Sequence, residues 1–189
     1  MLTDEQLMEA IVDGDRQAYA GAVKQHGRAI AAYAFRMLGN ESEAQDIAQE
    51  TFLRLWTQAH RWDGDKASLG TWLHRIAHNL CIDQRRRTRA DTGSELDEFT
   101  AEADTPSADQ LAQQSDRNRL EAALADLPER QRSALVMTYY QGLSNKEVAG
   151  ILDVSVDALE SLLSRGRKAL KNRLSKYVYQ PDSTGGVNR

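Results

Sequence analysis

Three side chains able to ligate a metal follow one another at helical spacing. His74 and His78 are four residues apart and Cys81 follows three residues later, so a helix would carry all three on one flank. This spacing is typical of zinc ligands. A zincin protease would need Glu directly after the first His, where this chain has Arg75. A zinc or thiol sensor, packing at the edge of a helical bundle, and a histidine contact to phosphate stay open.

The helix that carries them is predicted from Ser68 to about Arg87, and its opposite side is basic. A polar loop over residues 60–66 precedes it. Cations track phosphates, and rings or pockets hold unstacked bases, so this surface suits single-stranded nucleic acid. The alternative is a cluster of arginines favoured by the dipole at the helix C-terminus, which leaves Arg75 unexplained. The candidate residues are Trp62, Lys66, Trp72, Arg75, Asn79, Arg85 and Arg86.

The preceding helix is predicted from Asn40 or Ser42 to about His60, and it carries two kinds of apolar residue. One set repeats at core spacing. Leu53 and Trp56 lie off that face, among acidic and amide side chains. Large apolar residues on an otherwise polar face favour a docking surface for a partner, although a second buried face would give the same pattern. The candidate docking residues are Asp46, Gln49, Glu50, Leu53 and Trp56.

Residues 143–170 have the spacing of a helix-turn-helix. Ser144 and Glu147 form a capping box that starts the first helix. Ala149 supplies the small residue expected where the two helices cross. Asp153 falls where the turn needs a left-handed backbone, which Asp tolerates better than most residues. Ser155 can cap the second helix.

The second helix of this motif is predicted to enter the DNA major groove by its N-terminal end. From Arg165 to Lys176 there are six basic residues and no acidic one, which suits phosphate contacts. An ordinary helical hairpin with a solvated basic face is the plainer alternative. The candidate DNA-binding residues are Ser144, Lys146, Asp157, Glu160, Ser161, Ser164, Arg165 and Lys168.

Charge is distributed in blocks along the 189 residues, and the net charge of −4 conceals this. Residues 68–90 and 116–176 are net basic, whereas residues 91–115 hold seven acidic residues and no basic ones. A segment of that composition cannot build a core and is predicted to be a flexible acidic linker. The fold class is therefore all-α, with two small helical domains joined by that linker and a helix-turn-helix in the second.

The composition excludes several classes of protein. The sequence shows no signal peptide and no apolar run long enough to cross a bilayer, so we expect a cytoplasmic protein. The single cysteine excludes an internal disulfide. There is no glycine-rich phosphate loop and no serine nucleophile motif. We therefore expect no enzyme, no catalytic residue, no small-molecule substrate, no metal and no cofactor.

Three segments resemble, in order, those of a bacterial RNA polymerase sigma factor of the extracytoplasmic-function (ECF) group. Residues 46–56 (DIAQETFLRLW) look like the segment that binds core polymerase. Residues 71–86 look like the helix that melts and reads the −10 element. Residues 127–132 (LPERQR) with the helix-turn-helix look like the domain that reads the −35 element. The resemblance covers residues 4–176.

This resemblance implies a domain plan and a function. Residues 1–90 would be region 2, 91–115 the linker, 116–177 region 4 and 178–189 a flexible tail. The docking residues would face the clamp helices of the largest polymerase subunit, and region 4 the flap of the second subunit. The loop 60–68 with Asn79 would capture a flipped −10 base. An anti-sigma factor, often anchored at the inner membrane, would hold the chain inactive in a stress response, and the free chain would be a monomer.

The chain departs from the family pattern in its predicted recognition helix. Many members carry a basic residue around positions 161–163, where this chain has Ser161, Leu162 and Leu163. Glu160 is acidic near the groove, and a carboxylate can accept from cytosine N4. We interpret Glu160 as a residue that discriminates bases. The competing function is a stand-alone helix-turn-helix regulator with a sensory N-terminal bundle, which would usually dimerise on DNA.

Overall fold

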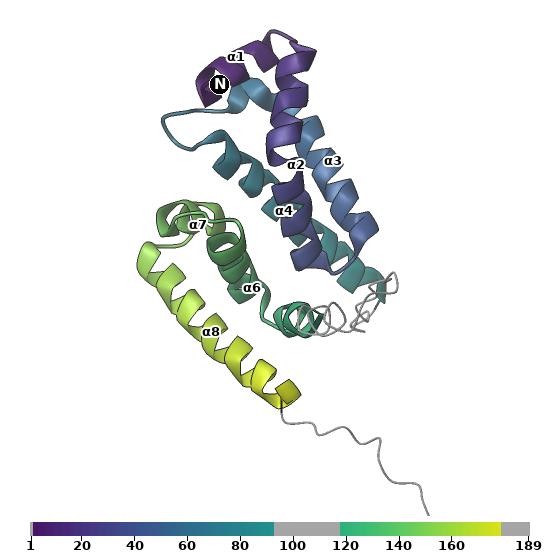
Figure 1. The fold of residues 1–189 in the computed structure, drawn as a ribbon, viewed down its shortest axis with the longest axis vertical. Coiled ribbons are helices and arrows are strands. Elements are labelled where there is room, and N and C mark those ends of the chain that lie inside the picture. The colour runs from purple at the N-terminus through teal and green to yellow at the C-terminus, as the bar shows by residue number, and fades with distance from the viewer. Residues whose placement is uncertain (1, 93–117, 179–189) are drawn as a thin grey trace, which may run out of the picture.

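The computed structural model describes residues 2–92 and 118–178 (Figure 1), and all regular elements within those ranges are helical. The predicted all-α fold with two helical domains is confirmed. The predicted acidic linker, apart from its first residues, and almost all of the predicted tail lie outside the described residues. None of the described helices is long and apolar enough to span a bilayer.

The first two helices begin and end at the residues that local chemistry favours. The helix α1 (Asp4–Val12) starts at a capping box between Thr3 and Gln6. Asp15 accepts hydrogen bonds from two backbone amides and opens α2 (Arg16–Leu38). Gly39 ends α2 with a left-handed φ of 77°.

Two further helices complete the N-terminal domain. Of the two predicted caps for α3 (Glu41–Gln58), Asn40 is the one used, since its side chain accepts from the Glu43 amide. A 3₁₀ turn, η1 (Ala59–Arg61), follows directly. The next helix, α4 (Leu69–Thr92), runs beyond the predicted end at Arg87 and into the start of the predicted linker. No breaking residue stands before Gly93, which explains the longer helix.

The C-terminal domain begins with a helix over residues 118–125, followed by α6 (Glu129–Leu135). The residues that directly follow α6, Val136–Tyr140, form a π-helical turn, η2. Pro128 is the N-cap residue of α6. The turn η2 places two tyrosines at the surface, Tyr139 and Tyr140.

The helix-turn-helix is formed by α7 (Asn145–Leu152) and α8 (Val156–Val178). Asp153 has φ 52° and ψ 54°, which confirms the predicted left-handed turn residue. Ser144 and Glu147 make the predicted capping box. Gly166 allows α8 to approach α6, because a Cβ there would lie 3.0 Å from Leu135 Cδ1.

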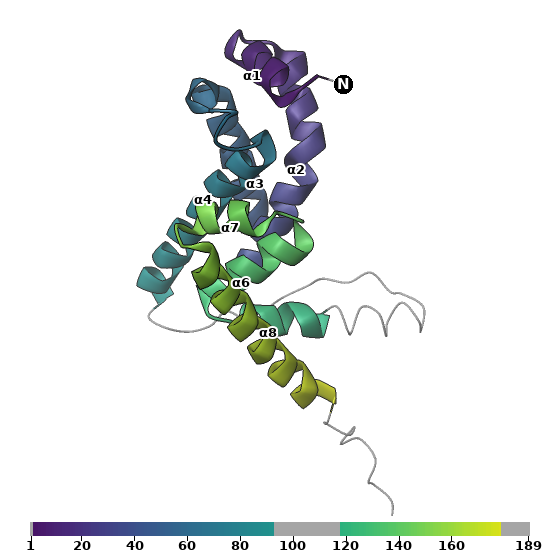
Figure 2. The ribbon, with the colours of Figure 1, turned by 90° about the vertical axis from the view of Figure 1, so that its left-hand side faces the viewer.

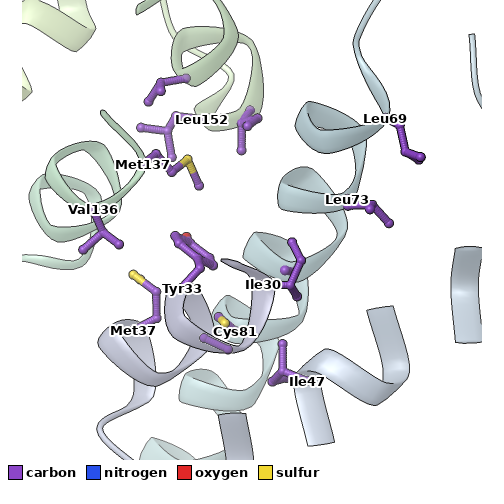
Figure 3. Packing of buried hydrophobic residues seen from close by; sticks show 14 of the residues in the cluster. Ile30, Tyr33, Met37, Ile47, Leu69, Leu73, Cys81, Val136, Met137 and Leu152 are labelled. Carbon is purple, nitrogen blue, oxygen red and sulfur yellow. The ribbon is translucent and has the colours of Figure 1, made fainter. Parts of the chain in front are cut away.

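The two domains pack against each other around one continuous apolar core. In both views α7 lies against α4, while the C-terminal end of α8 extends away from the N-terminal domain (Figures 1 and 2). Figure 3 shows Tyr33 and Met37 of α2 facing Val136 and Met137 of η2 across the interface. The sequence left open whether the domains pack together, and in this structure they do.

Candidate nucleic-acid and partner interfaces

The candidate docking residues share one outward face of α3, here called the docking face: Asp46, Gln49, Glu50, Leu53 and Trp56. Leu53 is 54% exposed and Trp56 37%, while Ile47, Phe52 and Leu55 of the same helix are buried. The Tyr19 and Trp56 rings pack edge to face, with their centroids 5.1 Å apart. The alternative of a second buried face is therefore wrong for this structure. Exposed apolar side chains fixed on a rigid helix suit a partner surface.

The predicted basic stripe follows one side of α4 and meets α7 at its first residue, because Arg75 Nη2 donates to the Gly150 carbonyl. Arg75, Asn79 and Arg86 are exposed and follow one another at helical spacing. In the preceding loop, Lys66 is exposed and its Nζ lies 2.6 Å from Asp63 Oδ2. The structure thus places three of the predicted nucleic-acid residues on one side of α4, and Lys66 in the loop that precedes the helix.

The two predicted tryptophans next to this stripe pack partly on the core. Trp62 and Trp72 are both half-buried against it. The Trp62 ring lies under Gly64, where a Cβ would come within 2.8 Å of the ring. The Trp62 ring is thus fixed within the loop, and part of each tryptophan surface is open to solvent.

Arg85 does not lie on the stripe. Its Nη1 donates to the Met37 carbonyl at 2.9 Å, and its Nε lies 3.3 Å from Glu129 Oε2 in the other domain. Ten helical positions after Arg75, the side chain has rotated away from the stripe. The structure therefore places Arg85 in the contact between domains, and its grouping with the nucleic-acid residues is not supported by this arrangement.

The possible metal ligands of α4 face inward. His74 Nδ1 is 2.8 Å from the Gly70 carbonyl, and His78 Nδ1 is 2.9 Å from the Tyr33 hydroxyl. Burial lowers the pKa of His78 to about 4 and raises the pKa of Cys81 to about 12. Within residues 2–92 and 118–178, no three His, Cys, Asp or Glu side chains are close enough to share a metal ion. Of the alternatives that the sequence left open for His74, His78 and Cys81, the structure agrees with packing inside the helical bundle.

The candidate duplex-binding residues form an exposed face on α8 and the start of α7. Six of them follow one another along the outer side of α8, and Lys146 is exposed in the first turn of α7. Arg167, beside this face, donates from Nη1 to the Tyr139 hydroxyl at 2.6 Å. The six are Asp157, Glu160, Ser161, Ser164, Arg165 and Lys168.

Ser144 is exposed but already hydrogen-bonded. Its Oγ donates to Glu147 Oε2 at 2.6 Å, and its backbone amide donates to the same oxygen at 2.8 Å. The hydrogen bonds from the Ser144 and Thr71 hydroxyls lower the pKa of Glu147. Glu147 is thereby held as a carboxylate between α7 and α4.

Sequence reasoning missed the residues that join the two domains. Thr71 donates to Glu147 Oε1 at 2.5 Å, and Arg75 donates to the Gly150 carbonyl. Arg132, only 3% exposed, donates to the Met37 carbonyl at 2.8 Å. An arginine in a charged segment has no local feature that predicts burial, because its partner carbonyl belongs to a distant helix.

Comparison with known proteins identifies both halves of this architecture. The family model described as sigma-70 region 2 matches residues 22–90, and that described as sigma-70, region 4 matches residues 117–170. The ECF RNA polymerase sigma factor SigW of Bacillus subtilis is 32% identical over 178 residues, covering 88% of this chain and 94% of the relative. The chain belongs to the ECF group of sigma-70 factors. It is therefore a DNA-binding transcription initiation factor, a class known for initiation rather than for catalysis.

Other ECF sigma factors support the same assignment. SigE of Mycolicibacterium smegmatis is 32% identical over 183 residues, covering 93% of this chain and 70% of the relative. The solved structure of CnrH with the cytosolic domain of CnrY superposes with a TM-score of 0.71 at 26% identity, over 92% of this chain and 97% of CnrH. Both domains of this ECF sigma factor thus have counterparts in a solved structure.

Proposed function

We propose that this chain binds core RNA polymerase through the docking face and directs it to promoters by capturing the −10 element on α4 and reading −35 duplex on α8. The observation that carries the proposal is the exposure of Leu53 and Trp56 on α3, a helix whose other large apolar residues are buried. Acidic Asp46 and Glu50 flank them, which suits a basic polymerase surface such as the clamp helices.

The two candidate nucleic-acid surfaces, on α4 and on α8, would bind different parts of the promoter. Arg75, Asn79 and Arg86 with the loop 60–68 would receive the separated −10 strand, since a single strand is held by cations and stacking. The exposed side of α8 would lie in the major groove of the −35 duplex. Region 4 would also contact the flap of the second polymerase subunit. The proposal keeps the domain bounds predicted from the sequence: region 2 at 1–90, the linker at 91–115, region 4 at 116–177 and the tail at 178–189.

Control of the chain by a protein partner is part of the proposal. CnrH was solved with the cytosolic domain of CnrY, and we propose that an anti-sigma factor likewise holds this chain in a stress response. The free chain would act as a cytoplasmic monomer without catalysis or cofactor, and a membrane-anchored anti-sigma factor would keep it at the inner face of the membrane.

Run-off transcription tests the central claim. Purified core polymerase is given genomic fragments with and without this protein, and discrete new start sites are expected. Leu53→Asp should abolish them, because a carboxylate replaces the apolar centre of the docking face. Val12→Asp is the matched control, since Val12 is 53% exposed on α1, outside the docking face.

The outcomes separate the two candidate functions. If transcripts were still made with the Leu53→Asp variant, the docking face would be excluded as the surface that binds polymerase. Absence of transcripts, combined with tight dimeric binding to duplex DNA alone, would replace the proposal with the stand-alone regulator.

A further inference from the structure

The N-terminal helix α1 reaches the loop 60–68 and the start of α4 through two acidic side chains. Asp4 Oδ2 accepts a hydrogen bond from the backbone amide of Leu69 at 2.8 Å, although 65 residues separate the two in sequence. Leu69 is the first residue of α4. Glu5 Oε1 lies 3.2 Å from the position that a Cβ would take on Gly64. Two successive residues of α1 thus meet the same loop at two points.

The hydrogen bond from Leu69 serves an amide that the local cap of α4 leaves open. The first amides of a helix have no acceptor within the helix. Ser68 Oγ accepts from the Thr71 amide at 3.2 Å, so this local cap serves the third residue of α4. Leu69 is 0% exposed, so water does not reach its amide. Because the first turn of α4 contains no acidic residue, Asp4 also supplies the negative charge that the helix dipole favours there.

The helix α1 is itself fixed on the N-terminal domain. Its Met8 and Ile11 side chains are each 2% exposed in the apolar core. The capping box of Thr3 starts the helix directly before Asp4. The helix also contacts η1, which leads into the loop (Figure 1). The core therefore sets the position of Asp4, and Asp4 in turn holds the start of α4.

The loop has one turn of its own, and burial does not hold that turn in place. The Asp63 carbonyl accepts from the Lys66 amide at 3.1 Å. Residues 64–66 are exposed. The loop is anchored before the turn by the half-buried Trp62 and after it by Leu69. The orientation of the turn relative to α4 therefore depends on the junction that Asp4 holds.

We infer that α1 is a positioning element for −10 recognition, in which Asp4 fixes the junction between the loop 60–68 and α4 and thereby the shape in which the loop captures a −10 base. Asp4 is a positioning residue, because it acts through the Leu69 amide and needs no contact with DNA. The helix precedes residues 22–90, which match sigma-70 region 2, so the inference adds an element to that region. It rests on the proposed function, since it takes this loop as the part that captures the base.

Substitutions on α1 separate positioning from folding. Asp4→Ala removes the acceptor, whereas Asp4→Asn keeps an oxygen that can accept from Leu69 without the charge. Thr3→Ala removes the capping box and leaves the carboxylate, so it should loosen Asp4 to a smaller extent. Asp13→Ala removes an exposed carboxylate at the other end of α1 and is the matched control. Circular dichroism of each variant checks that the helices form, and Thr3→Ala is compared with Asp4→Asn if Asp4→Ala does not fold.

The first measurement is amide hydrogen exchange on the full chain, followed by NMR spectroscopy. The Leu69 amide should exchange about fivefold faster or more in Asp4→Ala than in the wild type, a factor typical of the loss of one N-cap hydrogen bond. Asp4→Asn should restore about half or more of the protection, because a neutral acceptor forms a weaker hydrogen bond than a carboxylate. Asp13→Ala should leave the exchange of Leu69 unchanged. This measurement does not depend on polymerase.

The second measurement is run-off transcription with core polymerase from promoters whose −10 element is randomised. The promoters are those found with the genomic fragments. Asp4→Ala should reduce the preference for the favoured −10 base about fivefold, in line with the lost cap, and leave the −35 preference unchanged. Asp4→Asn should recover about half or more of the preference. A loss of folded protein would instead lower transcription from all sequences alike.

The outcomes distinguish the inference from the proposed function. Unchanged exchange of the Leu69 amide in Asp4→Ala would overturn the inference at its first step. Faster exchange with an unchanged −10 preference would overturn the positioning role and leave the sigma function intact. Absence of transcripts from the wild-type protein would overturn the proposed function, and the −10 role of Asp4 with it.

Discussion

The Arg132 guanidinium donates to the main-chain carbonyl of Met37 at 2.8 Å, although 95 residues separate the two in sequence. The same guanidinium lies 3.4 Å from the Leu127 carbonyl in its own domain. The Arg132 side chain is only 3% exposed, and its buried charge is tolerated because carbonyl groups from both domains accept hydrogen bonds from its N–H groups. This side chain therefore couples the fold of region 4 to the end of α2.

We expect Arg132→Ala to lower the free energy of unfolding by about 2–4 kcal/mol, because it leaves a cavity and deprives buried carbonyls of a donor. Arg130→Ala, on the exposed side of the same helix, should change it by less than about 0.5 kcal/mol. Urea denaturation followed by circular dichroism measures both. Equal effects of the two substitutions would contradict a special role for the buried arginine.

Two glycines should respond to alanine with opposite signs. Gly166→Ala should destabilise by roughly 1–2 kcal/mol through overpacking, since its Cβ would meet Leu135 at 3.0 Å and 3.2 Å. Gly150→Ala should stabilise by about 0.5–1 kcal/mol through reduced chain entropy, because its nearest neighbour would be Arg75 Nη2 at 4.0 Å. Thermal denaturation of the pair checks this, and a stabilising Gly166→Ala would show that α6 and α8 can move apart.

Acid should weaken the fold through His78. Its pKa falls from 6.5 to about 4 because burial disfavours the charged ring, with Arg130 adding to the effect. The unfolded chain therefore takes up a proton first, so the contribution of His78 is complete above pH 6.5 and is lost as pH falls towards 4. Burial also lowers the pKa of His26, which acts in the same direction.

The check is urea denaturation at pH 7 and at pH 4.5. His78→Gln keeps a polar group near the Tyr33 hydroxyl but cannot titrate, so the fall in stability between these pH values should be smaller by roughly 2–3 kcal/mol. An unchanged difference between the two pH values would assign the acid sensitivity to other groups.

Glu160 is expected to select bases within the −35 element. It is exposed on the outer side of α8, and a carboxylate that accepts from cytosine N4 contributes about 1–3 kcal/mol of discrimination. Glu160→Ala should therefore relax preference at one position in transcription from a library of −35 sequences. Lys168→Ala should weaken all sequences alike, as a phosphate contact does. An unchanged base preference in Glu160→Ala would rule out this reading.

Local structure was predictable from the sequence wherever short-range rules decide it. The caps Thr3 and Asp15, the left-handed Asp153 and the exposure of Leu53 off the core face of α3 all follow from the residue and its near neighbours. These features depend on contacts within one helix or one turn.

Features that depend on the contact between domains were not predictable. The apolar face that carries Tyr33 gives no sign of which domain covers it. Arg85 was predicted to contact nucleic acid, and Arg132 has no local feature that predicts its burial. The π-helical turn at Val136–Tyr140 has no sequence rule that separates it from a regular helix. For Tyr33, Arg85 and Arg132 the deciding partner lies on a helix far away in the sequence.

The inward position of Cys81 has a practical consequence. It is the single cysteine of the chain, fully buried, and burial raises its pKa to about 12. A thiol that stays protonated reacts slowly with maleimides and methanethiosulfonates. A cysteine introduced on α3 and another on α8 would thus accept spectroscopic probes in the native background, and the distance between the two domains could be followed during assembly with polymerase.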